Sequence, residues 1–431
     1  MKKHLLTLFF TLLIIGLNAQ TLYFKCTTAT SGQYNWNTAS NWYTDPLCTV
    51  SAGGTPISTN DVIIGNAAFT ANSQVINIDA SSQACKGFTI SYAGTYTNVA
   101  VVSVLGNVLN VFGHFNLTPF DNTKLSIANW KGDLTLNPVT TGTINVLTGG
   151  KRLVLNSINI PGNTIEYTVN FNDSLFLDRW FHTPAYSGYI TIGTGYTTTN
   201  SVKVNFNDLV KLGHYYVVQQ YGGNYHSSVE IISGNVSFNN GVFSTFPSSL
   251  YPFTFFDATY GTGGIIARNS ALVNISPQTL TSGSYPIARN KTLLGYLQAN
   301  GTSALNTTTI NAINQTIQID GPFTGNFSNI NFTNSIVNAN LRGNVYPFNS
   351  WGVNSNSLLS MVGSTLNLMP QGKTVNVGTF SQTNGHVYNI INVFDDLSIT
   401  RINAGSFSAN QFNVVTPNKT IFLSSWLFNA V

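Results

Sequence analysis

The carboxylates are the side chains of this 431-residue chain that could perform acid–base chemistry, and the 14 of them include two glutamates. Hydrolysis of a glycosidic bond needs two carboxyl groups placed on either side of that bond, about 5 to 10 Å apart. The strongest pair is Asp395-Asp396, which has Gly385-His386 upstream and Arg401-Ile402 downstream. The same two aspartates fall at the turn position of an internal repeat described below. We therefore interpret them as turn residues rather than as a catalytic pair.

These three fragments resemble elements of the polygalacturonase-type β-helix hydrolases, but their order differs. In that family the paired aspartates precede the Gly-His element, and the Arg-Ile element is followed by Lys. Here Gly385-His386 comes first and Asn403 follows Ile402. The resemblance therefore transfers no catalytic residue to this chain.

A lyase reaction would need a base beside a sugar carboxylate that Ca²⁺ or Arg neutralises. Asp178-Arg179 and Lys203 have suitable side chains, but their spacing has no distinctive pattern. The sequence contains no zincin motif, nucleophile elbow, phosphate loop or calcium-binding repeat. We therefore expect no catalytic residue, no metal site and no cofactor. The alternative is a polysaccharide-degrading β-helix enzyme, either a glycoside hydrolase or a lyase, or a carbohydrate-binding module.

A tyrosine-rich run lies between His214 and His226 and comprises Tyr215, Tyr216, Tyr221 and Tyr225. Two histidines without a third ligand give too few donors for a metal site, so we interpret the run as an exposed loop. Tyrosine rings have an apolar face and a polar tip, which suits stacking on sugar rings. These four tyrosines are the candidate glycan-stacking residues.

The elements that must position these residues are short β-strands. Apolar residues recur at every second position and almost never at helical spacing, most clearly from Leu109 to Leu117. Similar runs include Leu134 and Leu136, Ile158 and Ile160, Ile165 to Phe171, Val202 to Phe206, Val273 and Ile275, Ile317 and Ile319, and Val375 and Val377. Nearly every run is followed directly by Asn, Asp, Gly, Ser or Thr, which turn a chain readily. The pattern predicts an all-β protein.

A weak internal repeat consists of an apolar residue, a polar one, Phe, and then two residues of the Asn, Asp or Thr kind. Its copies are Val169 to Asp173, Val204 to Asp208, Val236 to Asn240, Ile330 to Asn334 and, more loosely, Asn392 to Asp396. Their spacing fits one, one, three and two steps of a period near 31 to 35 residues. Such a period predicts a solenoid in which the Phe and Val side chains stack from coil to coil. We expect Asn ladders at the bends that satisfy buried backbone groups.

The fold class predicted is a right-handed parallel β-helix. Its coils pair along their whole length, so few free strand edges remain. The alternative is a series of tandem β-sandwich modules, which would also show strands at regular spacing. Sandwiches need hairpin turns, and Asn-Gly pairs are few, occurring at Asn240, Asn300 and Asn384.

The N-terminus has the layout of a secretory signal peptide. Two lysines precede an apolar stretch from Leu5 to Leu17, which is short for a membrane span. We place the signal peptide at residues 1–19, with cleavage after Ala19. No later segment offers about 18 uninterrupted apolar residues, so we expect no transmembrane segment in the mature chain.

The composition points away from charged partners. Only 7% of residues are charged, against 43% hydrophobic and 12% aromatic, and the formal net charge is +4. Lys151-Arg152 is the one adjacent basic pair after the signal peptide. We therefore expect no nucleic-acid partner.

The three cysteines, Cys26, Cys48 and Cys85, all lie in the first fifth of the chain. In an oxidising compartment two of them can pair. Pairing of Cys48 with Cys85 or of Cys26 with Cys48 is equally compatible with the sequence. The C-x-x-C spacing of zinc sites is missing, so a metal site is not expected here.

The stretch Tyr34 to Trp42, followed by Gly53-Gly54-Thr55-Pro56 and Asn60 to Gly65, forms a pattern W…NW…P…D-V-I-I. It resembles the segment that opens β-solenoid regions in large secreted proteins of Bacteroidota and in autotransporter-like passengers. The resemblance covers about 35 residues and implies export, a right-handed β-helix and a cell-surface role in adhesion, gliding or biofilm matrix. It implies no catalytic residue.

Within this pattern we expect Trp36 and Trp42 to fill the core of a capping segment and Asp61 to be a turn residue before its strand. The predicted organisation is a signal peptide at 1–19, a capping segment at 20–75 and solenoid repeats at 76–431. Because the last residues are still apolar, we expect the solenoid to continue in a longer gene product. The predicted function is that of a secreted or cell-surface structural and adhesive protein that contacts glycans or neighbouring cells.

Overall fold

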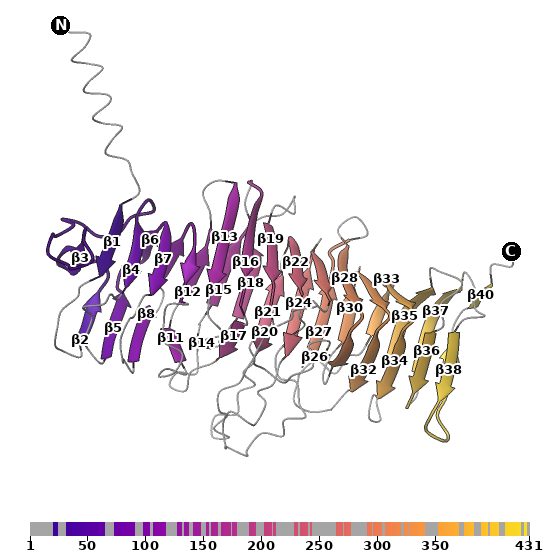
Figure 1. The fold of residues 1–431 in the computed structure, drawn as a ribbon. Helices are drawn as coiled ribbons and strands as arrows, with labels where there is room; N and C mark the ends of the chain where they lie inside the picture. Colours follow the sequence, from indigo (N-terminus) through magenta and orange to yellow (C-terminus); the bar gives the residue numbers. More distant parts are fainter. Residues whose placement is uncertain are drawn as a thin grey trace, which may run out of the picture.

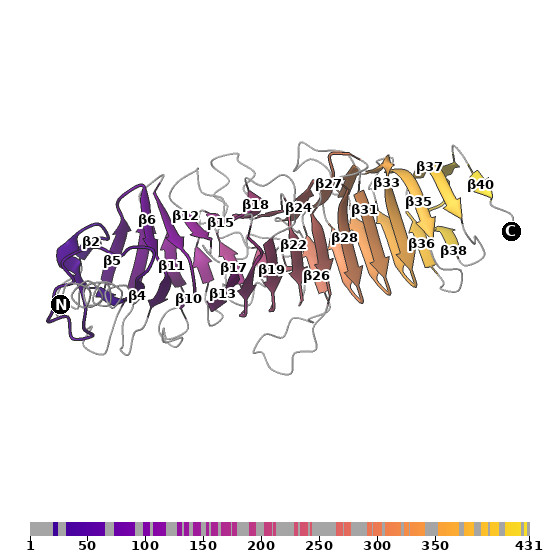
Figure 2. The same cartoon turned by 90° about the horizontal axis from the view of Figure 1, so that it is seen from above.

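The computed structural model is an elongated stack of short β-strands that runs from the indigo strands at one end to the yellow strands at the other (Figures 1 and 2). The structure describes residues 20–24, 32–64, 73–90, 98–103, 107–117, 127–131, 133–137, 141–147, 152–154, 157–162, 165–173, 175–178, 189–194, 202–208, 210–212, 228–231, 233–239, 242–243, 264–269, 271–276, 291–294, 296–303, 307–319, 323–326, 328–340, 352–369, 375–382, 389–394, 397–404, 410–423 and 426–428. Within these residues the one helical element is the 3₁₀ turn η1 (Ala39–Asn41).

The strands fall into three parallel columns, here called faces 1, 2 and 3, because each strand pairs with the equivalent strand of the next coil. Face 1 contains β1 (Thr21–Phe24), β4 (Asp61–Ile64), β7 (Gly87–Ile90), β10 (Phe115–Asn116), β13 (Gly142–Leu147), β16 (Tyr167–Phe171), β19 (Val202–Phe206), β22 (Asn235–Phe238), β25 (Leu272–Ile275), β28 (Thr308–Ile313), β31 (Ser328–Thr333) and β40 (Trp426–Phe428). Face 2 contains β6 (Ser82–Cys85), β9 (Val108–Val111), β12 (Asp133–Leu136), β15 (Ser157–Pro161), β18 (Tyr189–Thr194), β21 (Ser228–Ile231), β24 (Gly264–Arg268), β27 (Tyr296–Asn300), β30 (Phe323–Asn326) and β39 (Ile421–Leu423).

Among the described residues, face 3 is a separate 14-stranded sheet. It contains β2 (Gly32–Asn35), β5 (Ser73–Ile78), β8 (Asn98–Ser103), β11 (Ile127–Lys131), β14 (Arg152–Val154), β17 (Leu175–Asp178), β20 (Val210–Leu212), β23 (Val242–Phe243), β26 (Lys291–Leu294), β29 (Thr316–Ile319), β32 (Ile336–Asn340), β34 (Thr365–Met369), β36 (Asn389–Val393) and β38 (Asn410–Val414). One coil therefore consists of one strand from each face in turn.

In the part of the chain that the structure describes, faces 1 and 2 join into one 26-stranded sheet, because three long strands near the C-terminal end cross from face 2 to face 1. These are β33 (Gly352–Val362), β35 (Val375–Gln382) and β37 (Leu397–Ala404). In β33, for example, Val353 pairs with Gly325 of face 2, whereas Leu359 pairs with Ile330 of face 1.

Parallel pairing from coil to coil confirms a β-solenoid. Face 1 strands β16 and β19 align Val169 with Val204 and Phe171 with Phe206. Among the described residues, antiparallel pairing is limited to β1 with β3 (Trp42–Tyr43) and a bridge between Tyr43 and Ser51. Tandem sandwiches would need antiparallel hairpins throughout. The sandwich alternative is therefore wrong.

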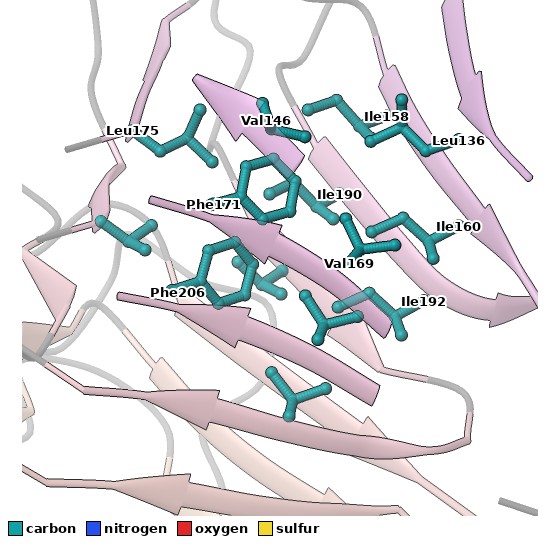
Figure 3. Packing of buried hydrophobic residues seen from close by; sticks show 14 of the residues in the cluster. Leu136, Val146, Ile158, Ile160, Val169, Phe171, Leu175, Ile190, Ile192 and Phe206 are labelled. Atoms are coloured by element: carbon teal, nitrogen blue, oxygen red, sulfur yellow. The ribbon is translucent and has the colours of Figure 1, made fainter. Parts of the chain in front are cut away.

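Alternation along each strand builds the core. In β16 the side chains of Tyr167, Val169 and Phe171 are buried, while those between them are half-exposed. Phe171 stacks on Phe206 at a ring-centroid distance of 4.8 Å (Figure 3). Phe206 stacks on Phe238 at the same distance. The predicted column of inward Phe and Val side chains is confirmed. Its source is the period of two that a strand imposes on its side chains.

The fifth copy of the internal repeat, Asn392 to Asp396, was assigned to the wrong column. Asn392 lies in β36 of face 3 and pairs with Asn367, whereas the Phe332 copy pairs with Met361 on face 1. Both faces have the same alternation, so the motif alone does not distinguish them. The coils also vary in length more than the predicted 31 to 35 residues. Paired asparagines in neighbouring coils are 20 residues apart at Asn311 and Asn331, and 37 apart at Asn274 and Asn311.

The corner after face 1 is made by residues with left-handed backbone. Asn314, Asn334 and Gly363 occupy equivalent places in three successive coils and have φ of 52°, 48° and 56°. The next residues form a buried polar ladder, in which the N–H of Gln315 donates to Ser335 Oγ at 3.2 Å and the N–H of Ser335 donates to Ser364 Oγ at 3.0 Å. Serine hydroxyls therefore satisfy these backbone groups, where we expected asparagine.

An aromatic cluster packs against the first coils. Trp36 and Trp42 have no exposed surface, and their rings lie 4.8 Å apart. Trp42 Nε1 donates to the carbonyl oxygen of Trp36 at 2.7 Å. Phe24 packs edge-on against Trp42, and Phe88 stacks on Trp36. Both tryptophans therefore lie in the core, as expected.

Candidate functional site

The outward positions of face 1 form a continuous polar row, here called the amide row. It consists of Asn145, Asn170, Asn205, Ser237, Asn274, Asn311 and Asn331, which are aligned by the strand pairings. Ser360 is paired with Asn331 in the next coil but is buried, so the row ends at Asn331. Each residue lies between two buried apolar neighbours, as Asn170 does between Val169 and Phe171. The alternation that fills the core with apolar side chains therefore also presents a polar side chain to solvent at this position, which is asparagine except at Ser237.

The side chains of the row bond to one another. Asn170 Nδ2 donates to Asn145 Oδ1 at 3.2 Å, and Asn205 Nδ2 donates to Asn170 Oδ1 at 2.9 Å. After Ser237, Asn311 donates to Asn274 at 2.9 Å and Asn331 donates to Asn311 at 2.8 Å. In every case the later coil donates to the earlier one. The amides are thereby held in one orientation along the stack.

A second, shorter line of amides lies beside the row where the face 1 strands end. Asn207 Nδ2 donates to Asn172 Oδ1 at 2.9 Å, and Asn239 Nδ2 donates to Asn207 Oδ1 at 2.9 Å. Asn172 also donates to Asn145 of the row at 3.4 Å. The two lines together form a two-dimensional array, here called the amide patch, made of Asn145, Asn170, Asn172, Asn205, Asn207 and Asn239.

Face 3 carries its own outward ladder. Asn367 donates to Asn338 at 2.6 Å, Asn392 donates to Asn367 at 2.7 Å and Asn413 donates to Asn392 at 2.9 Å. This ladder is a single line in the C-terminal half. It shows that the same amide chemistry recurs on two faces of the solenoid.

The amide patch can bind by hydrogen bonding. An asparagine amide has two N–H groups and two acceptor lone pairs, and the ladder uses one N–H and one lone pair of Asn170. Neighbouring strands lie about 4.8 Å apart. The patch therefore offers donors and acceptors at a regular spacing, which suits a partner with repeating hydroxyl or amide groups.

Asp61 and His114 lie at the N-terminal end of the same row, and their side chains occupy the space above Gly87. A side chain at Gly87 would place its Cβ 2.5 Å from Asp61 Oδ1 and 2.2 Å from His114 Cε1. Asp61 Oδ2 is 3.6 Å from Lys86 Nζ, and His114 Nε2 is 3.2 Å from Thr89 Oγ1. Asp61 Oδ1 is buried without a hydrogen-bond partner. Asp61 is the first residue of β4 rather than a turn residue, because its backbone continues the ladder with Gly87.

The candidate lyase residue Lys203 lies outward on β19 and forms an exposed ion pair with Glu166. The hydrogen bond from the Lys203 ammonium, and then its positive charge, hold the pKa of Glu166 below its ordinary value. Lys203 is therefore engaged with a neighbouring coil. No cluster of three or more His, Cys, Asp or Glu that could hold a metal occurs among the described residues.

Several predicted residues lie outside the described part of the chain. They are the signal peptide 1–19, Cys26, Arg179, His214, Tyr215, Tyr216, Tyr221, Tyr225, His226, Gly385-His386 and Asp395-Asp396. The backbone of Asp178 ends β17, and that of Arg401-Ile402 lies in β37. The glycan-stacking and acid-pair interpretations therefore stay predictions.

The cysteines separate into one bonded and one free residue. Cys48 is disulfide-bonded, and Cys85 is a free thiol buried in the core. Pairing of Cys48 with Cys85 is therefore wrong. The Sγ of Cys48 lies 3.6 Å from the carbonyl oxygen of Phe24, two residues before Cys26. The pairing of Cys26 with Cys48 stays a prediction because Cys26 lies outside the described residues.

Comparison with known proteins adds no functional assignment. No family model, curated protein or solved structure matches this chain. Among the described residues, helices of a length and hydrophobicity that could span a bilayer do not occur. Function is therefore inferred from the side chains themselves.

The amide row was not predicted from the sequence, although its signal was present. The repeat contains Asn between the apolar residue and Phe in three of its copies, at Asn170, Asn205 and Asn331. We expected asparagine ladders at the bends, and Asn172, Asn207 and Asn239 do follow the strands. The mid-strand asparagines point outward instead and bond to other amides.

Proposed function

We propose that the protein is a secreted or cell-surface structural and adhesive β-solenoid, which presents an extended surface to glycans or neighbouring cells and performs no catalysis. The observation that carries this proposal is the amide row, which repeats outward hydrogen-bonding side chains from Asn145 to Asn331 on one face. A catalytic site concentrates its functional groups in one place, whereas this face repeats them along its length.

Export is supported by independent features. The apolar stretch Leu5 to Leu17 has the layout of a signal peptide, and the disulfide at Cys48 suits an oxidising compartment. The W…NW…P…D-V-I-I segment resembles surface proteins of Bacteroidota. The same resemblance supports a place at the cell surface.

Two finer features of the fold belong to the proposal. We assign the solenoid a right-handed winding, because crossovers between parallel strands are right-handed in about 98% of cases. We assign residues 20–75 as an N-terminal cap. The supporting contacts are the antiparallel pairing of β1 with β3 and the buried pair Trp36 and Trp42, which close the first coil.

The test uses the full mature chain. Fluorescently labelled protein is applied to glycan-coated surfaces and to whole cells, and retention is measured together with release of reducing ends from pectin, alginate and glycosaminoglycans. Retention without turnover supports the proposal. Robust turnover that a single Asp substitution abolishes rejects it in favour of a polysaccharide-degrading enzyme.

A further inference from the structure

We propose that the amide patch on face 1 is a binding site for a neutral linear polysaccharide, whose chain lies along the row across successive coils. This inference rests on the proposed function and names the ligand class and the face. Three properties of the patch carry it: its hydrogen-bonding pattern, its charge and its rigid support.

The hydrogen-bonding pattern matches sugar hydroxyls. Each hydroxyl can donate one hydrogen bond and accept two, so it can pair with either end of an amide. Asn145 and Asn172 are exposed, and Asn170, Asn205 and Asn239 are half-exposed, so solvent reaches the array. A polymer that repeats its hydroxyls along its axis can contact several coils at once. Many weak contacts then add to useful affinity.

The charge of the patch disfavours anionic chains. On strands β13, β16, β19 and β22 the single charged residue is Lys203, and this lysine is paired with Glu166. Asp173 and Asp208 directly follow the outer amides Asn172 and Asn207. A uronate or sulfate chain would approach these carboxylates, and the described strands that carry the patch have no cluster of cations to receive it. A neutral chain meets no such repulsion.

Rigid support lowers the cost of binding. The strands that carry the amides have the stacked rings of Phe171, Phe206 and Phe238 on their inner side, each with at most 1% exposed surface. The amides also fix one another through the ladder. Little side-chain entropy remains to be lost when the ligand binds.

The experiment compares two matched variants by titration calorimetry with a soluble neutral β-glucan and with polygalacturonate. Asn170→Ser/Asn205→Ser removes two amides from the patch, and serine already occupies the row at Ser237. Asn367→Ser/Asn392→Ser makes the same change in the face 3 ladder. We expect about a tenfold loss of β-glucan affinity in the first variant, from two lost hydrogen bonds, and less than a twofold change in the second.

A third variant blocks the face and leaves the amide bonds in place. Ser237→Tyr adds an outward ring in the middle of the row, because Ser237 is half-exposed on β22. We expect the same loss of β-glucan binding with an unchanged circular dichroism spectrum. This variant keeps the proposal testable if the double variant folds poorly.

The outcomes separate the two proposals. Equal binding by the wild type and all three variants, or binding of polygalacturonate alone, overturns the patch as a neutral-glycan site and leaves the adhesive function standing. Adhesion to cells without any polysaccharide binding does the same. Absence of both polysaccharide binding and adhesion overturns both proposals.

Discussion

The ring of Phe206 stacks on that of Phe238 in the next coil, with centroids 4.8 Å apart and planes within 5° of parallel. Both rings belong to the inward column of face 1, in which Phe171 covers the other side of Phe206. Each ring is therefore packed between equivalent residues of the coils before and after it. The contact couples the stability of adjacent coils.

Phe206→Ala should strongly destabilise the solenoid. Truncation removes a fully buried ring and leaves a cavity between two coils, at a cost of about 3 to 5 kcal/mol in the free energy of unfolding. Urea unfolding followed by tryptophan fluorescence measures the change. Lys203→Ala on the same strand is the control, because Lys203 is exposed and should have little effect. A loss below about 1 kcal/mol for Phe206→Ala would contradict the stacked core.

Gly234→Ala should also destabilise the fold, for a backbone reason. Gly234 has φ of 103°, and a Cβ there would lie 2.7 Å from both Cγ1 and the carbonyl oxygen of Val202. Left-handed backbone costs a residue with a side chain about 1 to 3 kcal/mol, and the clash adds to this. Gly54→Ala is the matched control, since nothing lies within 4 Å of a Cβ at that position. Similar melting temperatures for both variants would refute the expectation.

Because Cys85 is a buried free thiol, we expect the protein to lose stability at alkaline pH. Burial, and then the nearby charge of Asp61, raise the pKa of its thiol far above the ordinary value. The unfolded thiol releases its proton above pH ~8.5, whereas the folded one keeps it. The unfolded state then binds fewer protons, so the free energy of unfolding falls with rising pH, by at most about 1.4 kcal/mol per unit.

The measurement is the slope of the unfolding free energy between pH ~8.5 and ~9.5. Cys85→Ala should lose this slope, although its baseline stability will also be lower. Burial raises the pKa of Tyr167 in the same way, so the comparison stays below the range in which an ordinary tyrosine ionises. An identical slope in the variant would exclude Cys85 as its source. Native Cys85 should also resist thiol reagents until the chain unfolds.

The disulfide at Cys48 should stabilise the N-terminal segment. Closing a loop of about twenty residues contributes about 3 kcal/mol. Mild reduction should therefore speed hydrogen exchange in residues 32–64 and leave the central coils unchanged. Peptide mapping without reduction should recover Cys48 joined to Cys26, and Cys85 as a free thiol. Recovery of a Cys85 cross-link would contradict the structure.

The sequence predicted the all-β class and the stacked column because strand alternation depends on neighbouring residues. Val169 and Phe171, Val204 and Phe206, and the equivalent pair at Val236 are close enough in type and spacing to reveal one column. The predicted strands around Ile158, Val273 and Ile317 are likewise strands of the structure. These features can be predicted without knowing the lengths of the loops between the strands.

Features that depend on coil length could not be predicted. Loops between strands vary, so the coil at Asn311 returns after 20 residues and that at Asn170 after 35. Sequence spacing therefore did not show that Phe394 follows a face 3 strand, nor that His114 returns beside Asp61 across Gly87. The pairing of Cys48 with Cys85 could not be excluded from the sequence for the same reason. Whether Cys85 is buried depends on the coil that it joins.

The outward position of the asparagines depends on which alternate residues of each strand face the core. Asn170 and Asn172 are two residues apart, so they lie on the same side of the strand. The motif alone does not show whether this side or the side of Phe171 faces solvent. Once Phe171 is placed in the core, both asparagines must face outward. The sequence thus contained the row but not its accessibility.

The uniform direction of the amide hydrogen bonds has an electrical consequence. In the two stretches Asn145 to Asn205 and Asn274 to Asn331 each later amide donates to the earlier one, so within each stretch the side-chain dipoles add as peptide dipoles do in an α-helix. The row therefore has a direction, because the bonded amide N–H groups point toward the first coils. A polymer with distinct reducing and non-reducing ends would meet different fields in its two antiparallel placements, and one alignment would be preferred.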